Sequence, residues 1–176
     1  MKTLLHSTLV AGALLMVSGV AFAQTTTGTL TVTATVTSSI GLTFENDGAG
    51  VALVGAGTNA ATMAFGNISA YGAISTVGVT RTVGASAFTV SSPFGVQVIK
   101  ANSPSSLTYT LAAALATADT TNTWQIDSTT LTGSNQNLGT SYSYATPVTH
   151  TVFLTVPFTA SSGSISRIIN FTATAN

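Results

Sequence analysis

Residues 148–158 read Val-Thr-His-Thr-Val-Phe-Leu-Thr-Val-Pro-Phe, and the side chains that point to one side of an extended chain are almost all apolar. This alternation with a period of two is typical of a β-strand with one buried face. The expected buried face consists of Val148, His150, Val152, Leu154, Val156 and Phe158.

A second alternating stretch follows after Ala160-Ser-Ser-Gly163, which reads as a loop. Its expected inward face is Ile165, Arg167, Ile169, Phe171, Ala173 and Ala175. Two alternating runs joined by a short polar loop predict an antiparallel hairpin. The sequence therefore predicts a C-terminal hairpin of residues 148–158 and 165–175, with its apolar face on the core.

Near the other end, threonine occupies every odd position from Thr25 to Thr37. The even positions from residue 30 onward are apolar: Leu30, Val32, Ala34 and Val36. Threonine and β-branched residues favour extended backbone, so residues 24–37 are expected to form a strand. Such a strand can pair within its own fold or add to the open sheet edge of a neighbour, and these four apolar residues are the candidate strand-addition interface.

The first 23 residues have the pattern of a secretory signal peptide. Lys2 gives a positive start, Leu9–Val20 is a short apolar core, and Ala21-Phe22-Ala23 has the small-x-small form that signal peptidase accepts. Cleavage is expected between Ala23 and Gln24, which places the mature protein in the periplasm, on the cell surface or outside the cell. The apolar core is too short for a membrane span, and no span is expected in the mature chain.

Short strand-like runs separated by Gly, Asn, Ser and Asp fill the part of the chain between these ends. They are Ile40–Phe44, Val51–Val54, Thr62–Phe65, Ile74–Val83, Ala87–Val90, Phe94–Lys100, Leu107–Leu115, Trp124–Ile126 and Tyr142–Tyr144. A mature chain of about 150 residues suits one domain. We expect residues 38–176 to form a single all-β domain, either a sandwich or a barrel.

The composition limits the classes of function. Charged residues make up only 5% of the chain, and cysteine is absent. After cleavage the charges are Arg81, Lys100 and Arg167 against Glu45, Asp47, Asp119 and Asp127. This balance argues against a nucleic-acid surface, and the lack of cysteine leaves stability to packing and backbone pairing. A surface of Thr, Ser, Ala and Gly is more typical of extracellular assemblies than of free enzymes.

No motif of catalysis or metal binding is evident. His150 is the only histidine of the mature chain, no Gly-x-Ser-x-Gly motif occurs, and the carboxylates are scattered. Glu45 and Asp47 beside Gly48 read as a turn, because the series of oxygen ligands of a calcium loop is missing. We therefore expect no catalytic residue, metal or cofactor. Trp124, Tyr142 and Tyr144 could form an aromatic platform for a sugar, although such residues more often pack in a core.

The chain resembles bacterial surface-fibre and coat subunits of the chaperone–usher pilin and spore-coat-U type. The resemblance rests on the signal peptide, the alternating N-terminal strand, the series of short strands, and the ends Thr151–Pro157 and Ile168–Ala175. It implies an Ig-like antiparallel β-sandwich that the N-terminal strand of the next subunit completes, with a periplasmic chaperone and an usher as partners. Many relatives have a disulfide and a tyrosine near the C-terminus, and this chain has neither.

The sequence thus predicts an exported, non-enzymatic structural subunit that self-associates into a surface fibre, coat or matrix by β-strand addition. The alternative is a monomeric secreted β-sandwich that binds carbohydrate or mediates adhesion, in which the N-terminal strand closes its own sandwich. A hydrolase is a third hypothesis, weakened by the lack of clustered histidine and carboxylate residues.

Overall fold

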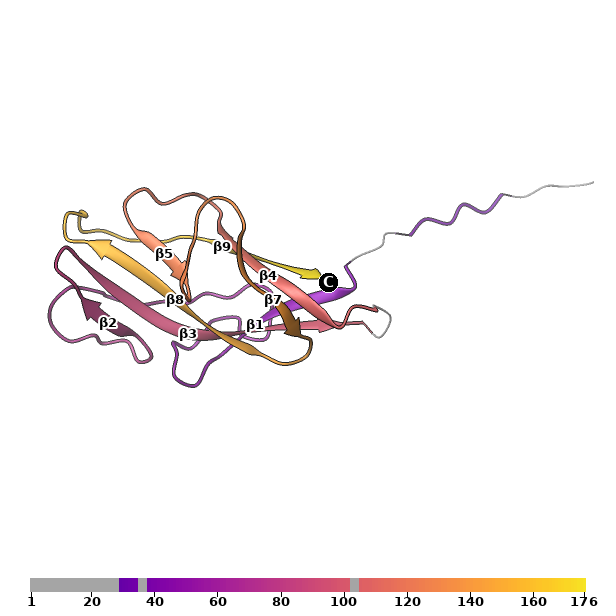
Figure 1. The fold of residues 1–176 in the computed structure, drawn as a ribbon, viewed down its shortest axis with the longest axis horizontal. Coiled ribbons are helices and arrows are strands. Elements are labelled where there is room, and N and C mark those ends of the chain that lie inside the picture. The colour runs from indigo at the N-terminus through magenta and orange to yellow at the C-terminus, as the bar shows by residue number, and fades with distance from the viewer. Residues whose placement is uncertain (1–28, 35–37, 102–104) are drawn as a thin grey trace, which may run out of the picture. The chain divides into compact units, whose positions relative to one another are not determined.

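The computed structural model describes residues 29–34, 38–101 and 105–176. The chain divides into two units, Met1–Val36 and Thr37–Asn176. In the first unit, residues 29–34 belong to no strand. In the second, the described residues form two antiparallel sheets and no helix (Figure 1). None of the described residues therefore belongs to a helix that could cross a membrane.

The all-β prediction is confirmed, and the two sheets form a β-sandwich. The strands are β1 (Ile40–Glu45), β2 (Thr80–Val83), β3 (Ala87–Lys100), β4 (Thr108–Leu115), β5 (Thr123–Ile126), β6 (Thr129–Thr130), β7 (Gln136–Ser143), β8 (Val148–Pro157) and β9 (Ile169–Ala175). The larger sheet has the order β1-β3-β8-β5-β6, and β2 also pairs with β3. The smaller sheet has the order β7-β4-β9.

Strand β3 is the central strand of the larger sheet and joins two runs that the sequence predicts as separate strands. The two predicted runs, Ala87–Val90 and Phe94–Lys100, leave out residues 91–93, which include Pro93. A proline inside a strand removes a ladder hydrogen bond. In the structure β2 pairs with Thr89 and its neighbours up to Ser91, while β1 pairs from Gly95 onward. Pro93 therefore lies where one side of β3 has no strand partner, and its missing N–H interrupts no ladder there.

The predicted C-terminal hairpin is wrong in its pairing. Its second strand begins at Ile169 instead of Ile165. The predicted inward faces hold within the two strands, except that Phe158, Arg167 and Ala175 are exposed. Strand β8 pairs with β3 and β5 in the larger sheet, whereas β9 pairs with β4 in the smaller one. The segment between them, residues 158–168, contains no strand and crosses from one sheet to the other. An apolar face toward the core is required in a hairpin and across a sandwich alike, so alternation could not distinguish the two.

The core lies between the sheets and uses the predicted faces. In β8, Val152, Leu154 and Val156 are buried, and the residues between them are less so. In β9, Phe171 packs against the core and Thr172 is exposed. The buried apolar residues are Val51, Phe88, Val90, Phe94, Val96, Val98, Tyr109, Leu111, Ala113, Ala114, Leu115, Trp124, Ile126, Leu131, Val152, Leu154 and Val156.

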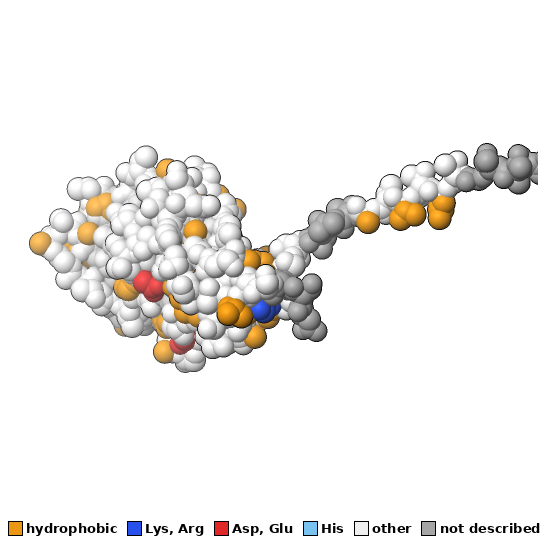
Figure 2. Space-filling model, turned by 45° about the vertical axis from the view of Figure 1, so that its right-hand side comes forward, with side chains coloured by type: hydrophobic (Ala, Val, Ile, Leu, Met, Phe, Trp, Pro, Cys, Tyr) orange, Lys and Arg blue, Asp and Glu red, His pale blue; other side chains and the backbone are white. Residues whose placement is uncertain are grey.

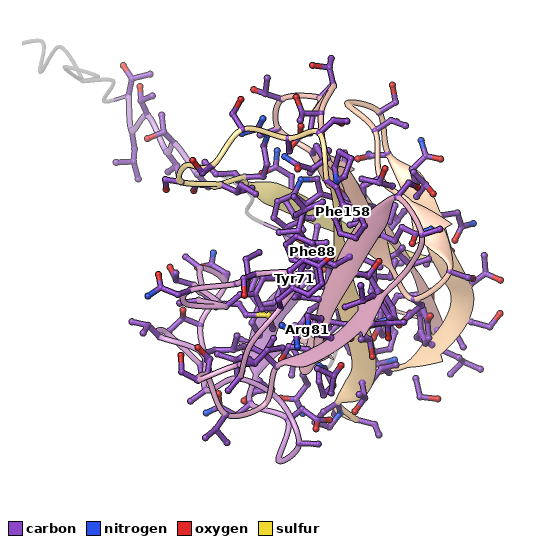
Figure 3. All side chains as sticks on the ribbon, turned by 90° about the vertical axis from the view of Figure 1, so that its left-hand side faces the viewer. Tyr71, Arg81, Phe88 and Phe158 are labelled. Carbon is purple, nitrogen blue, oxygen red and sulfur yellow. The ribbon has the colours of Figure 1, made fainter. Side chains whose placement is uncertain are left out.

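A long coil connects β1 to β2 and replaces two predicted strands. Val51–Val54 and Thr62–Phe65 form no strand, and only the single bridge between Val54 and Thr62 joins them. The coil is anchored by Arg81, whose guanidinium donates to the carbonyl oxygens of Ser69 at 2.7 Å and Gly72 at 2.8 Å (Figure 3). One charged side chain of β2 thus holds the middle of the coil.

The outer face of the larger sheet is rich in hydroxyl groups. A row of threonines crosses four neighbouring strands, with Thr82 opposite Thr89, Thr89 opposite Thr155, and Thr155 opposite Thr123. The hydroxyls of Thr89 and Thr155 lie 2.7 Å apart. Charged side chains are sparse on the face of the molecule seen in Figure 2. Hydroxyl pairs rather than ion pairs therefore satisfy part of this surface.

Candidate functional site

Two strand edges, one from each sheet, border the same groove. Strand β1 ends the path of the larger sheet, and β9 ends the smaller sheet. Between them lies a cavity of about 640 Å³ lined by Ile40–Phe44, Gly57–Asn59 and Ile169–Phe171. We call this groove, with its two bordering strands, the seam.

The backbone of β9 presents unpaired groups to the seam. The carbonyl oxygen of Ile168 accepts from Ala116 N–H at 2.9 Å, and Asn176 N–H donates to Thr108 O at 3.0 Å, so even-numbered residues of this segment bond toward β4. Backbone groups of successive strand residues point in opposite directions within the sheet. Those of Phe171 and Ala173 therefore point away from β4, where no described strand pairs with them.

Strand β1 presents its backbone in the same way from the other side. Ser39 bonds toward β3, because its carbonyl oxygen accepts from Ala101 N–H at 2.9 Å. By the same alternation, the N–H and C=O of Leu42 and the C=O of Ile40 point away from β3 and toward the seam. No other strand of the described chain pairs with this edge. The two edges thus offer backbone donors and acceptors to an additional strand.

The floor of the seam is apolar. The rings of Phe44 and Phe171 meet edge to face at 5.2 Å, and each also contacts Phe94, at 6.4 Å and 5.8 Å. A second cavity of about 1200 Å³ shares Phe44 and Phe171 with the first and reaches Trp124, Ile126 and Leu154 below the coil. Apolar side chains that entered the seam would leave water and join the core.

The predicted strand-addition residues are exposed in the isolated chain. Leu30 is 88% exposed and Val32 is 79% exposed, and Ala34 is also exposed. Val36 lies outside the described residues, as do Ala23 and Gln24 at the predicted cleavage point. Single exposed apolar residues are common on proteins, but here they recur at the spacing of a strand.

His150 is buried, as its place on the inward face of β8 predicts, since it is only 2% exposed. Its Nδ1 lies 2.7 Å from Oδ2 of Asp127, and Oδ1 of that carboxylate accepts from Thr151 N–H at 2.8 Å. Among the described residues, Nε2 of His150 has no hydrogen-bond partner. The pair therefore lacks the hydroxyl that a Ser-His-Asp arrangement would place on this nitrogen.

Asp119 is the centre of a polar cluster that joins two loops. Oδ1 accepts from the N–H groups of Thr121 and Asn122, both at 3.0 Å, while Oδ2 accepts from the indole of Trp124 at 3.0 Å and lies 3.3 Å from Nε of Arg167. The side chain is only 1% exposed. Burial alone would raise the pKa of Asp119, but the donors, led by the Asn122 backbone and the Trp124 indole, hold it well below its usual range.

The aromatic platform is not assembled. Trp124 is buried and bound to Asp119, whereas Tyr142 and Tyr144 pack their rings on Tyr109 at 5.5 Å and 5.3 Å. These residues serve the core at separate places. Within the described residues, no group of three or more His, Asp or Glu side chains could hold a metal ion.

Sequence patterns identified β1 as a strand and the apolar face of β9, but not the seam itself. The seam exists because β9 pairs with β4 in the smaller sheet instead of with β8. The other edge of β9 therefore has no strand partner among the described residues. Comparison with protein-family models, curated proteins and solved structures gave no match. Function is therefore inferred from the sequence and the geometry of this chain.

Proposed function

We propose that the protein is an exported, non-enzymatic structural subunit of a bacterial surface fibre, coat or matrix. The seam of one copy would receive residues 29–37 of another as an added antiparallel or parallel strand. The observation that carries the proposal is the seam: two strand edges with unpaired backbone groups on either side of an apolar floor. Open edges of this kind are templates for pairing with another chain.

The N-terminal stretch supplies the matching half of the interaction. Leu30, Val32 and Ala34 are exposed at alternate positions, and the threonines between them would face solvent after addition. Backbone hydrogen bonds give affinity in β-augmentation, while side chains at alternate positions set the register. An Ig-like sandwich completed in this way also agrees with the resemblance to pilin and spore-coat-U subunits.

The short connection to β1 favours addition to a neighbour over closure of the same sandwich. Only Ser38 and Ser39 separate residues 29–37 from Ile40. Closing its own seam would require this segment to fold back beside β1 through a two-residue hairpin. Such hairpins favour turns with positive φ, which Gly, Asn and Asp adopt more readily than serine.

Export after cleavage at Ala23 would deliver the subunit to the compartment where assembly takes place. Until a neighbour arrives, the seam leaves apolar surface and strand edges uncovered, which is a hazard for aggregation. A periplasmic chaperone that covers the seam, and an usher that exchanges it for the next subunit, are the partners expected for this function.

The test compares the mature protein, residues 24–176, with two single variants on opposite faces of the same segment. Val32→Asp would place a charge on the apolar floor of the seam, whereas Thr31→Asp would place it in solvent. Electron microscopy and sizing should find linear assemblies of wild type and Thr31→Asp and monomers of Val32→Asp. A wild-type protein that stays monomeric at high concentration would contradict the proposal and favour the monomeric binding module.

A further inference from the structure

A turn of the coil already occupies one end of the β1 edge. The N–H of Phe44 donates to the carbonyl oxygen of Thr58 at 2.8 Å, and Gly57 N–H donates to the carbonyl oxygen of Phe44 at 2.7 Å. Phe44 points its backbone to the same side of β1 as Leu42. The coil therefore satisfies, at Phe44, the backbone groups that an added strand would use.

Local hydrogen bonds and glycine conformations, and not the pairing of a sheet, fix the conformation of this turn. Gly55 and Gly57 have φ values of +87° and +79°, which side chains with a Cβ rarely adopt. Thr58 N–H donates to the carbonyl oxygen of Gly55 at 3.2 Å. The Thr58 hydroxyl lies 2.7 Å from that same oxygen and 2.8 Å from the carbonyl oxygen of Ala60. The local bonds of Thr58 hold its carbonyl against β1.

The turn meets β1 beside the aromatic floor of the seam. Phe44, which carries the two backbone bonds, is the residue whose ring contacts Phe171 of β9 at 5.2 Å. Gly57, Thr58 and Asn59 line the same cavity as these two strands. A strand that extended along the whole of β1 would meet the turn and the aromatic contact together.

We propose that the Gly55–Asn59 turn is an internal occupant of the acceptor edge, which an added strand displaces in order to pair with β1 as far as Phe44. The inference rests on the proposed function, because it concerns how the same seam is opened. Before assembly, the turn protects the end of the edge from unwanted pairing. Its release then limits the rate at which subunits add.

Two variants loosen the turn in different ways. Thr58→Val removes the hydroxyl that braces the turn and keeps every backbone donor. Gly57→Pro removes the N–H that bonds to Phe44 and excludes the positive φ. Thr140→Val and Gly163→Pro are the matched controls, since Thr140 is exposed on β7 and a Cβ at Gly163 would meet nothing within 4 Å.

Assembly of the full mature protein, followed by light scattering, should be roughly fivefold faster for Thr58→Val, the effect of losing one hydrogen bond of ordinary strength. Gly57→Pro should be at least as fast, and both controls should match wild type. Thr58→Val with an unchanged circular dichroism spectrum and a wild-type or slower rate would overturn the inference. If Val32→Asp blocks assembly but Thr58→Val assembles at the wild-type rate, the inference about the turn fails and the proposed function stands.

Hydrogen exchange gives a second measurement. If the turn were merely structural, the protection of its amides would be the same in the monomer and in the assembly. In the monomer, Gly57 N–H should be protected by its bond to Phe44. In the assembled protein, Phe44 N–H should stay protected, because the added strand replaces Thr58, while Gly57 N–H should exchange rapidly. Continued protection of Gly57 in the assembly would overturn the displacement. Absence of any assembly by wild type would overturn the proposed function and this inference with it.

Discussion

The structure gives Asp119 a stabilising role that its place in the sequence does not indicate. In the sequence it is one of a few scattered carboxylates with no motif around it. In the structure it accepts bonds from the backbone of Asn122 and the indole of Trp124, and it lies beside Arg167. It therefore connects the loop after β4 to the segment before β9, which borders the seam.

Asp119→Ala should lower the free energy of unfolding by about 3 kcal/mol, because it leaves buried donors without their charged acceptor. The pKa of Asp119 is lower in the folded protein than in the unfolded chain. Its stabilising contribution is therefore complete above the ordinary carboxyl range, near pH 4, and is lost as the pH falls below it.

Denaturant titrations of wild type and Asp119→Asn between neutral and acidic pH measure this contribution. The stability difference between the two proteins should be largest near neutrality and should shrink below about pH 4. Thr121→Ala, which keeps the backbone N–H that bonds to Asp119, is the matched control and should behave as wild type. A difference that is constant with pH would show that Asp119 does not stabilise the fold as a carboxylate.

At the level of elements, the sequence predicted the positions of several strands but not their pairing. Of the predicted run Ile74–Val83 only Thr80–Val83 is a strand, and the predicted run Tyr142–Tyr144 overlaps only the end of Gln136–Ser143. β1, β4, β5 and β8 lie within a residue or so of their predicted bounds. The predicted strands Val51–Val54 and Thr62–Phe65 are wrong, because a single bridge between Val54 and Thr62 is the only pairing between them. A sequence shows which face of a strand is apolar, but not which sheet the strand joins, because both sheets of a sandwich present apolar faces to one core.

The seam could not be predicted from the sequence for the same reason. Phe44 and Phe171 are far apart in the chain, and neither carries a signal beyond its place on an apolar face. Their contact follows from β1 and β9 being the edges of different sheets. The N-terminal half of the proposed interaction, Leu30 and Val32, could be identified from sequence because its pattern is local.

Disulfide trapping can measure the register of the added strand, because the chain contains no cysteine of its own. Thr172 on β9 is exposed, so a cysteine there would face outward beside the seam. We expect Thr172→Cys to form disulfides between subunits with a cysteine at one of Thr29, Thr31, Thr33 or Thr35, whose side chains would share that outward face.

Cysteines at Leu30 or Val32 are the matched controls, since they would point to the opposite face of the added strand. Mixed assemblies should yield cross-linked dimers on denaturing gels, with a maximum at one odd-numbered position. Equal yields at odd and even positions would contradict a single register.

At the level of the whole molecule, the low charge of the chain bears on how copies would associate through the seam. A subunit with 5% charged residues has little electrostatic repulsion to keep copies apart. In the proposed assembly, specific pairing would therefore have to direct how copies associate. The seam and the segment proposed to fill it would provide that direction, because alternate apolar side chains would lie on the floor formed by Phe44 and Phe171.

Deleting residues 24–37 separates addition to a neighbour from closure of the same sandwich. If the segment serves a neighbour, the truncated protein keeps both sheets and should unfold cooperatively, but it should no longer assemble. A synthetic peptide of residues 29–37 should then bind to its seam, because the apolar side chains leave water and the backbone groups of β1 and β9 find partners. Calorimetry and sizing of the truncated protein with and without the peptide measure both effects.

The same peptide with Val32→Asp should not bind, since it would bury an unpaired charge, whereas the peptide with Thr31→Asp should bind as the unmodified one does. A truncated protein that is unfolded, and that the peptide restores to a monomeric fold, would instead assign the segment to its own sandwich.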